Sequence, residues 1–354
     1  MFFNKKIETK NEYVIPIFVP HLGCRFKCTF CDQRTISGEH NRVRAKDVKE
    51  TIEYYLSNFK DKDKYVEVAF FGGSFTAIDE SIQNELLEAV QEYIADGRVN
   101  SIRCSTRPDA ITKDILKRLK KYHVKVIELG VQSSNDYILK KCQRGHTFED
   151  VEKASKLIKK AHILLGHQVM CGLPEATEKD DIRTAKDSVR LKPDMCRIYP
   201  VLVIKGTELE EEYNAGTYKP LTVKQAVERA KEMIKIYRKN NVNVIRVGLQ
   251  NTDVISDIGE EKSDVVSGPF HPAFWQLVED EIWLEKIENE IKKINSKVLK
   301  IRIEANKENI NNIVGHKKEN LSRLRDTYAL SDIIVKENKD MKKDKFKVIV
   351  LERA

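Results

Sequence analysis

Short apolar runs alternate with longer amphipathic stretches along the first 250 residues of the chain. Most apolar runs end at Gly, Pro or Ser and are rich in β-branched and aromatic residues, a pattern typical of buried strands. The stretches between them repeat apolar residues every three or four positions, as helices that cover a core do. The predicted strands are Tyr13–Val19, Tyr65–Phe71, Ser101–Ser105, Lys125–Val131, Leu164–Met170, Met195–Val203 and Asn243–Val247. The predicted helices are Lys46–Phe59, Glu80–Ile94, Lys113–Lys120, Phe148–Ala161, Lys179–Leu191 and Val223–Asn240.

This alternation of strands and helices predicts a parallel sheet with crossover helices. An open sheet and a (β/α) barrel fit the alternation equally well. Polar or Gly-rich clusters directly follow most of the strands, among them 72–74, 106–108, 132–133 and 172–174. Barrels place their sites at the carboxyl ends of many strands, whereas an open sheet concentrates its site at one switch point. The sequence therefore predicts a partial (β/α) barrel.

The pattern changes after residue 250. Asn251–Gly268 is polar and lacks periodicity, so we interpret it as a linker or a substrate-side loop. The predicted elements beyond it are a helix at Ala273–Ile294, a strand at Val298–Ala305, a helix at Lys307–Arg325 and strands at Ser331–Val335 and Phe346–Leu351. The Lys-rich stretch Lys336–Lys347 is interpreted as a solvated hairpin or loop. We expect a barrel over 1–250, a linker over 251–272 and a small α/β C-terminal domain over 273–354.

Composition narrows the class of protein. Hydrophobic residues make up 41% of the 354 residues, enough for a packed core, and no apolar run is long enough to span a membrane. The first 11 residues lack the apolar middle of a secretory signal, so we expect a cytoplasmic protein without a membrane partner. The net charge of +8, from 63 basic and 55 acidic residues, is compatible with a nucleic-acid partner but is weak evidence for one.

Three of the seven cysteines, Cys24, Cys28 and Cys31, lie in one loop with C-x-x-x-C-x-x-C spacing. Three thiolates can hold a [4Fe–4S] cluster and leave one iron open to bind a small molecule. A structural zinc site needs a fourth ligand, and the nearby His21 and His40 keep that alternative open. The isolated cysteines are expected to be small buried hydrophobic residues, and they are Cys104, Cys142, Cys171 and Cys196.

The cysteine run, with the aromatic Phe30 before its third cysteine, resembles the signature of the radical SAM superfamily. Further motifs resemble that superfamily in the expected order, namely Phe70–Phe75, Glu128–Ser133 and Arg144–Thr147. Within the superfamily, the chain is similar to the radical SAM portion of Elongator protein 3. That likeness lies in Thr106–Asp109, Arg197–Pro200, Gly206–Thr207 and Tyr213–Pro220, and it covers about residues 13 to 250.

The resemblance implies a TIM-like partial (β/α)6 barrel that binds a [4Fe–4S] cluster and S-adenosylmethionine. It implies that Cys24, Cys28 and Cys31 ligate the cluster, which reductively cleaves S-adenosylmethionine to a 5′-deoxyadenosyl radical that abstracts hydrogen from a substrate. A flavodoxin or ferredoxin type donor is expected to supply the electron. The residues implied to bind the cofactor are Gly72, Gly73, Ser74, Ser105, Arg107, Gln132, Arg144 and Gln168.

Two of these positions depart from the relatives. Ser105 stands where Elongator protein 3 has Glu, and Gln168 stands where oxygen-independent coproporphyrinogen oxidases have Asp. Both departures put the contacts to the cofactor ribose in doubt. Three other polar residues are expected to have local hydrogen-bonding or packing roles, and they are His146, His167 and Tyr199.

The substrate does not follow from the sequence. About 100 residues follow the barrel, so we expect no acetyltransferase domain like that of Elongator protein 3. An RNA or tRNA substrate is compatible with the likeness and the charge. The alternatives are a coproporphyrinogen-oxidase-like radical SAM enzyme, a non-catalytic RNA-binding protein that keeps the cluster as a scaffold, and a zinc-stabilised binding module.

Overall fold

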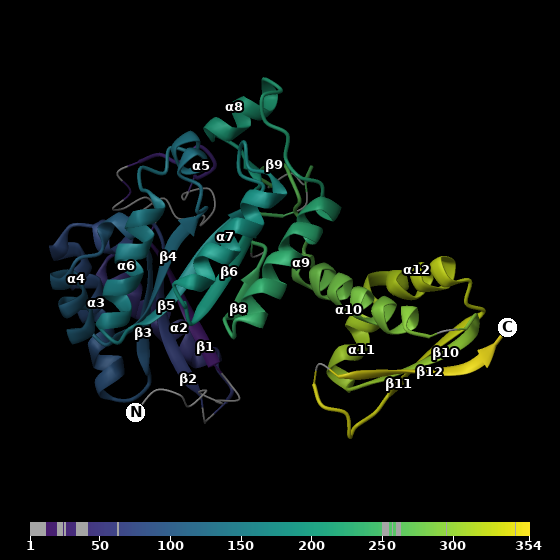
Figure 1. Cartoon of the computed structure of the whole chain (residues 1–354). Coiled ribbons are helices and arrows are strands. Elements are labelled where there is room, and N and C mark those ends of the chain that lie inside the picture. The colour runs from purple at the N-terminus through teal and green to yellow at the C-terminus, as the bar shows by residue number, and fades with distance from the viewer. Residues whose placement is uncertain are drawn as a thin grey trace.

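A computed structural model describes residues 12–19, 24, 26–32, 42–61, 64–249, 255–256, 258–259, 263–294, 296–343 and 345–354. Its main sheet has seven parallel strands in the order β1-β2-β3-β4-β5-β6-β8, which curl into a half-barrel (Figure 1). These strands are β1 (Glu12–Val19), β2 (Tyr65–Gly72), β3 (Ser101–Thr106), β4 (Val124–Gln132), β5 (Leu164–Cys171), β6 (Met195–Pro200) and β8 (Asn243–Val247). The predicted partial barrel is confirmed.

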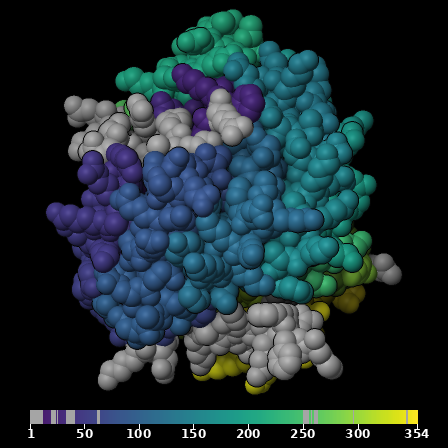
Figure 2. All heavy atoms as spheres, turned by 90° about the vertical axis from the view of Figure 1, so that its left-hand side faces the viewer, coloured from purple at the N-terminus to yellow at the C-terminus, as the bar shows by residue number. Residues whose placement is uncertain are grey.

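Crossover helices cover the outer face of this sheet (Figure 1). They are α2 (Ala45–Asn58), α3 (Glu80–Ala95), α4 (Lys113–Lys121), α6 (Phe148–Lys160), α7 (Glu178–Arg190) and α9 (Val223–Lys239). Helix α6 illustrates their construction: Thr147 and Asp150 form a capping box at its start, and Val151, Ala154 and Ile158 form one buried face. Figure 2 views the molecule from the side of α3 and α4, and the C-terminal domain shows only at its lower edge.

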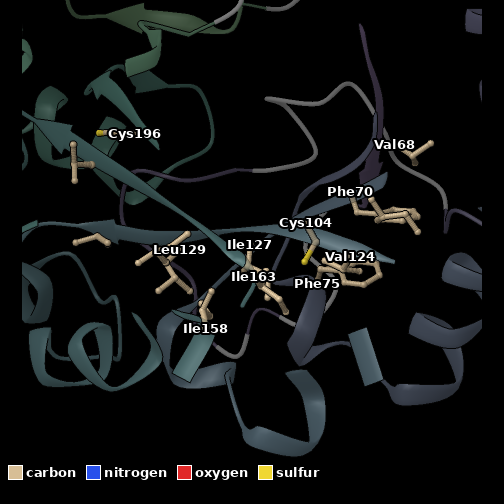
Figure 3. Packing of buried hydrophobic residues seen from close by; sticks show 14 of the residues in the cluster. Val68, Phe70, Phe75, Cys104, Val124, Ile127, Leu129, Ile158, Ile163 and Cys196 are labelled. Atoms are coloured by element: carbon tan, nitrogen blue, oxygen red, sulfur yellow. The ribbon is translucent and has the colours of Figure 1, made fainter. Parts of the chain in front are cut away.

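Alternate residues of the strands face opposite layers. Apolar side chains such as Val68, Ile127 and Leu129 pack between the strands and the helices (Figure 3). The isolated cysteines are all fully buried, and Cys104 and Cys196 lie in this apolar layer, as predicted. The opposite, concave face of the sheet carries polar side chains instead, and the candidate site lies there.

One predicted strand, Met195–Val203, is divided in the structure. Strand β6 ends at Pro200, which has no N–H to continue the ladder, and β7 (Val203–Ile204) pairs antiparallel with β9 (Val265–Ser267). Two short helices that the sequence pattern did not predict, α5 (Asp136–Lys141) and α8 (Glu208–Asn214), lie at the same end of the barrel (Figure 1).

The C-terminal domain is a three-stranded sheet in the order β11-β10-β12, covered by helices. Its elements after the barrel are α10 (Phe274–Lys292), β10 (Val298–Ala305), α11 (Lys307–Val314), α12 (Glu319–Tyr328), β11 (Asp332–Glu337) and β12 (Phe346–Arg353). The single helix predicted over Lys307–Arg325 is wrong, because the chain takes positive φ angles at 315, 317 and 318. Of the hairpin or loop predicted over Lys336–Lys347, the hairpin is wrong, since β11 and β12 flank β10 on opposite sides. The described residues between these two strands form a loop.

Helix α10 belongs to two hydrophobic cores. Its first half contributes Phe274, Val278 and Ile282 to the barrel core. Its second half contributes Trp283 and Leu284, among others, to the core of the C-terminal domain. The two parts of the molecule are therefore joined by a packed helix. Among the described residues, no helix combines the length and apolar character that crossing a membrane requires.

Candidate functional site

A cavity of about 110 Å³ opens at the carboxyl ends of the barrel strands. Its lining includes the three clustered cysteines and all eight residues that were predicted to contact the cofactor. Four further residues that the sequence analysis did not assign to the site, and Phe30, complete the lining. The full set is Cys24, Phe26, Lys27, Cys28, Phe30, Cys31, Gly72, Gly73, Ser74, Ser105, Thr106, Arg107, Gly130, Gln132, Arg144 and Gln168.

Backbone hydrogen bonds hold the cysteine loop in place. Thr29 N–H donates to the carbonyl of Cys142 at the end of α5 (3.3 Å), and Leu209 N–H of α8 donates to the carbonyl of Thr29 (2.8 Å). Cys31 N–H donates to the carbonyl of Cys28 (3.1 Å). The two helices that the sequence pattern missed therefore anchor this loop.

The three cysteines share the cavity but do not form a compact metal cage here. Within the ranges that the structure covers, no three His, Cys, Asp or Glu side chains are grouped so that they could hold a metal ion. Cys28 is buried, whereas Cys24 and Cys31 are half-buried and face the cavity from the rest of the loop. His21 and His40, the candidates for a fourth zinc ligand, lie outside the described residues.

Arg144 connects the cysteine loop to the sheet. Its Nη1 donates to Cys28 Sγ (3.2 Å) and its Nη2 donates to the carbonyl of Gly130 (2.8 Å). Its buried Nε has no partner among the residues that the structure describes. Arg144 therefore joins the sulfur of Cys28 to the backbone of β4.

Arg107 lines the same cavity, contacts the cysteine loop and is almost fully buried. Its Nε donates to Asp109 (2.9 Å) and its guanidinium stacks over the ring of Phe26 (4.9 Å). Its buried Nη2 has no partner within the described part of the chain. Gly145 is needed on the other side of that ring, because a Cβ there would lie 2.4 Å from Phe26. Phe26 was missed by the sequence analysis, although its place inside the cysteine motif could have indicated it.

The Gly-Gly turn at the end of β2 is shaped by its contact with β1. Gly72 has φ +104°, and a Cβ there would meet the backbone of Val19 at 3.1–3.2 Å. Gly73 N–H donates to the carbonyl of Val19 (2.8 Å). The crowding that requires glycine at position 72 therefore comes from the end of β1, and this turn places Gly73 and Ser74 on the cavity wall.

Unsatisfied polar atoms indicate what the cavity can bind. Among the described residues, Gln132 Oε1 is an acceptor without a partner, and Arg107 Nη2 and Arg144 Nε are donors without partners, all three buried. Buried polar atoms are normally paired, so an unpaired set of both kinds is typical of a ligand site. The arginine donors fit a carboxylate, the glutamine acceptor fits an amino group, and the nearby thiols fit a metal cluster. The cavity therefore suits a cofactor that carries a carboxylate and an amino group and binds next to a cluster.

The two positions at which the chain departs from the relatives bond to each other. Gln168 Nε2 donates to Ser105 Oγ (3.0 Å) and to Glu128 Oε2 (2.9 Å). The pair therefore joins the cavity wall to the ion-pair network below it.

Glu128 is the centre of that network and is 1% exposed. Arg197 Nε and Nη2 donate to its carboxylate (2.6 and 3.1 Å), and so does Arg103 Nη1 (2.9 Å), which also pairs with Glu67. Burial alone would raise the pKa of Glu128, but Arg197 and Arg103 outweigh burial and hold that pKa below its usual range. Glu128 was noticed only as part of a motif, and its central position could not be seen without the sheet register.

Neither histidine of interest is charged near neutral pH. Burial, together with Arg144 and Arg107, lowers the pKa of His146 to about 3. His167 lies on the helix side of β5, where its ring nitrogens contact Ser188 Oγ (2.8 Å) and Ser155 Oγ (3.1 Å), and burial lowers its pKa to about 3. His167 therefore has the local hydrogen-bonding role that was expected. Burial also raises the pKa of Tyr199.

A larger hollow of about 370 Å³ lies elsewhere, between α4 and α6 on the outer face of the barrel. Its lining is Lys113, Leu116, Lys117, Lys120, Leu157, Lys160 and Ala161. It contains none of the predicted residues and no side chain suited to redox chemistry, so we assign the site to the smaller cavity.

Comparison with known proteins gives matches over most of the chain. The family model of the radical SAM superfamily matches residues 18–187, and that of the radical SAM C-terminal domain matches residues 193–283. An uncharacterized protein of Methanocaldococcus jannaschii is 32% identical over 238 residues, which cover 64% of this chain and 72% of that protein.

Two further similarities concern tRNA-modifying proteins. A tRNA uridine(34) acetyltransferase of the same archaeon is 33% identical over 183 residues, covering 46% of this chain but only 34% of that protein. The solved structure of Methanocaldococcus infernus Elp3 with an N-terminal deletion has a TM-score of 0.62 and 25% identity, and the match covers 78% of this chain and 63% of that one. The chain thus spans about a third of the acetyltransferase that it matches.

Proposed function

This chain belongs to the radical SAM superfamily, and from that premise we propose that it is an enzyme that uses a [4Fe–4S] cluster and S-adenosylmethionine to modify RNA. The observation that supports the proposal best is the convergence of the three motif cysteines and the eight candidate cofactor residues on one cavity. They come from the ends of β2 to β5 and from two loops, so the convergence arises from the fold and not from sequence proximity.

The cysteine loop is the proposed cluster site. Cys24, Cys28 and Cys31 would hold the cluster, and Arg144 would donate to the Cys28 sulfur from the sheet side. When bound, the cluster and S-adenosylmethionine supply reductive cleavage to a 5′-deoxyadenosyl radical. Phe30, which is 8% exposed, packs beside Cys28 and limits the access of water to the sulfur.

The unpaired polar atoms are the proposed cofactor contacts. Arg107 Nη2 and Arg144 Nε are suited to a carboxylate, and Gln132 Oε1 is suited to an amino group. Ser105 and Gln168 stand on the wall of the same cavity and offer a hydroxyl and an amide to a polar group of the cofactor. The Phe26 ring, held between Arg107 and Gly145, covers the cavity from the loop side.

RNA is the proposed substrate class. Its support is the similarity to proteins named tRNA uridine(34) acetyltransferase and to the human Elongator complex protein 3. The electron is proposed to come from a flavodoxin or ferredoxin type protein, since cluster reduction needs a donor of low potential.

The test is anaerobic reconstitution with iron and sulfide, followed by incubation with dithionite and S-adenosylmethionine, with and without cellular RNA. We expect about four irons per chain, as the proposed cluster requires, and formation of 5′-deoxyadenosine, with a mass change in the RNA. The Cys28→Ala variant is expected to lose iron and 5′-deoxyadenosine formation together, whereas Cys104→Ala, in the apolar layer, is the matched control that retains both. Stoichiometric zinc in place of iron, or no cleavage of S-adenosylmethionine, would contradict the proposal.

A further inference from the structure

The positive charge of the C-terminal domain is concentrated in the part that follows α10, since α10 itself carries six acidic and two basic residues and brings the charge of the whole domain down to +3. Residues 293–354 carry sixteen Lys and Arg against nine Asp and Glu, a net charge of +7, and the whole chain has only +8. The barrel and α10 together are therefore almost neutral. Proteins bind nucleic-acid backbones by neutralising phosphates with Lys and Arg, so the part of the C-terminal domain beyond α10 is the electrostatic candidate for an RNA contact.

The loop between α11 and α12 presents part of this charge in a defined conformation. It reads Gly315-His316-Lys317-Lys318, and Gly315, Lys317 and Lys318 all have positive φ angles of +77°, +51° and +66°. The side chains of Lys317 and Lys318 are exposed, and neither makes an ion pair within the described part of the chain. Most arginines of the domain are neutralised instead, for example Arg323 by Glu281.

The elements around the loop form a strand–helix–loop–helix–strand unit. Strands β10 and β11 are parallel neighbours, β11 is the edge strand, and α11 and α12 both pack against β11. KH domains hold the backbone of single-stranded RNA at a Gly-x-x-Gly loop between two helices. Lys318 stands at the position of the second glycine of such a loop. It adopts the left-handed conformation that glycine would take and adds a charge.

Buried polar groups hold the loop from below. Asp280 of α10, which is 4% exposed, accepts a hydrogen bond from His316 N–H (2.7 Å) through Oδ2. Asn320 Nδ2 donates to the carbonyls of Asp280 (2.8 Å) and Asn312 (3.0 Å), and a Cβ on Gly315 would lie 2.8 Å from Asn320 Cγ. A loop that is fixed before binding loses less conformational entropy on binding.

The loop also faces the barrel. The His316 ring lies 5.5 Å from the His271 ring in an edge-on arrangement. His271 follows β9 closely, and β9 pairs with β7 just beyond the carboxyl end of β6, the end at which the candidate site opens. An RNA strand held at the loop would therefore lie on the side of the C-terminal domain that is joined to the barrel.

We propose that the loop 315–318 clamps the phosphate backbone of single-stranded RNA. The identity of that RNA as the substrate rests on the proposed function, whereas the clamp itself does not. Two lysines that each neutralise one phosphate supply the charge, and the left-handed turn brings both side chains to one short stretch of backbone.

The experiment measures binding of a fluorescein-labelled single-stranded RNA of mixed sequence to the full chain by fluorescence anisotropy over a range of salt concentrations. The double variant Lys317→Asp, Lys318→Asp is expected to raise the Kd at least tenfold. The slope of log Kd against log salt should fall by about 1.4, because each lost phosphate contact on a single strand accounts for about 0.7. Asp tolerates the left-handed region, so the loop is expected to keep its conformation.

The matched control is Lys179→Asp, Lys186→Asp, which makes the same charge change at two exposed positions of α7. This control should bind RNA within about twofold of the parent, as expected for a long-range effect screened by salt. Lys317→Arg, Lys318→Arg should retain binding. If the aspartate variant unfolds, Lys317→Gln, Lys318→Gln replaces it, with a smaller loss of affinity in the same direction.

Two outcomes overturn the clamp: unchanged RNA binding by the loop variants, or an equal loss of RNA binding in the α7 control. Formation of 5′-deoxyadenosine without RNA is measured in parallel and separates the two proposals. If the protein cleaves S-adenosylmethionine and the loop variants bind RNA normally, the clamp alone is refuted. If RNA binding depends on the loop but S-adenosylmethionine is not cleaved, the proposed function alone is refuted.

Discussion

At the scale of single residues, the floor of the candidate site is an ion-pair network that the apolar pattern could not reveal. Glu128 is buried and contacts two arginines and Gln168. A buried carboxylate of this kind is costly to desolvate and becomes favourable only because its partners are fixed around it. The network therefore orients Gln168 and, through it, Ser105.

The first prediction concerns this carboxylate. Glu128→Gln leaves Arg103 and Arg197 without their buried counter-charge and is expected to lower the free energy of unfolding by about 3–5 kcal/mol at pH 7. The folded-state pKa of Glu128 lies below its unfolded value of about 4.3, so its contribution is complete above that pH and is lost as the pH falls through the folded pKa.

Urea unfolding of the parent and of Glu128→Gln at several pH values checks both statements. The difference between the two proteins should shrink below pH 4. If the difference in unfolding free energy stays constant at acid pH, the loss of stability in Glu128→Gln comes from altered packing and not from the lost charge. Lys156→Ala, at an exposed position of α6, serves as the control and should change stability little.

The second prediction concerns His167. Its pKa of about 3 lies below the unfolded value of about 6.5, so the neutral ring contributes stability that is complete above pH 6.5 and is lost as the pH falls toward 3. Compared with His167→Gln, which does not titrate, the parent should lose about 1.4 kcal/mol more for each pH unit between 6 and 4. Parallel stability curves for the two proteins would refute this assignment.

The lining of the candidate cavity was largely predictable from the sequence, because motif glycines, cysteines and Arg144 carry recognisable spacing. The role of Arg103 could not be predicted, since the sequence does not show which face of the sheet an arginine inside a strand lies on. Phe26 was also missed, because its role depends on Gly145, which lies more than 100 residues away in the chain.

At the scale of elements, turns that follow strands determine the shape of the site. The end of β1 lies so close to the end of β2 that Gly72 meets Val19 backbone atoms. This contact fixes where Gly73 and Ser74 enter the cavity.

The third prediction compares two glycines with positive φ. Gly72→Ala adds a backbone clash to the conformational strain, whereas Gly97→Ala, with φ +79° and open space around it, adds strain alone. We expect Gly97→Ala to cost about 1 kcal/mol and Gly72→Ala about 2–3 kcal/mol. Urea midpoints measure both, and equal losses would argue against the clash.

The elements that the sequence pattern predicted well are long and periodic, such as α6 and β10. It failed where a few residues redirect the chain. Pro200 ends β6 early, and Gly315 with the two lysines after it divides a helix that is otherwise amphipathic throughout. Helices α5 and α8 have six and seven residues, too few to show a period.

At the scale of the whole molecule, two cores of unequal size share α10. The C-terminal core is small, and a core of that size supplies few kcal/mol by itself. The chain has two tryptophans, and each reports one core: Trp275 packs against the barrel core, and Trp283 is buried in the C-terminal core beside Phe346.

The fourth prediction uses them as separate probes. In guanidinium titrations followed by fluorescence, Trp275→Phe leaves Trp283 as the reporter and should show the lower midpoint. Trp283→Phe leaves Trp275 and should show the higher one. Coincident midpoints would mean that α10 couples both cores into one cooperative unit.

A shared helix also sets a length. Helix α10 has 19 residues and therefore extends about 28 Å, at about 1.5 Å per residue. Because both of its halves are packed, the domain that it carries has a fixed offset from the barrel, in contrast to a domain on a flexible tether. For an RNA held at the C-terminal domain and modified in the barrel, α10 would fix the distance between the two sites. The reacting nucleotide would then lie a constant number of nucleotides from the held one, whatever the sequence between them.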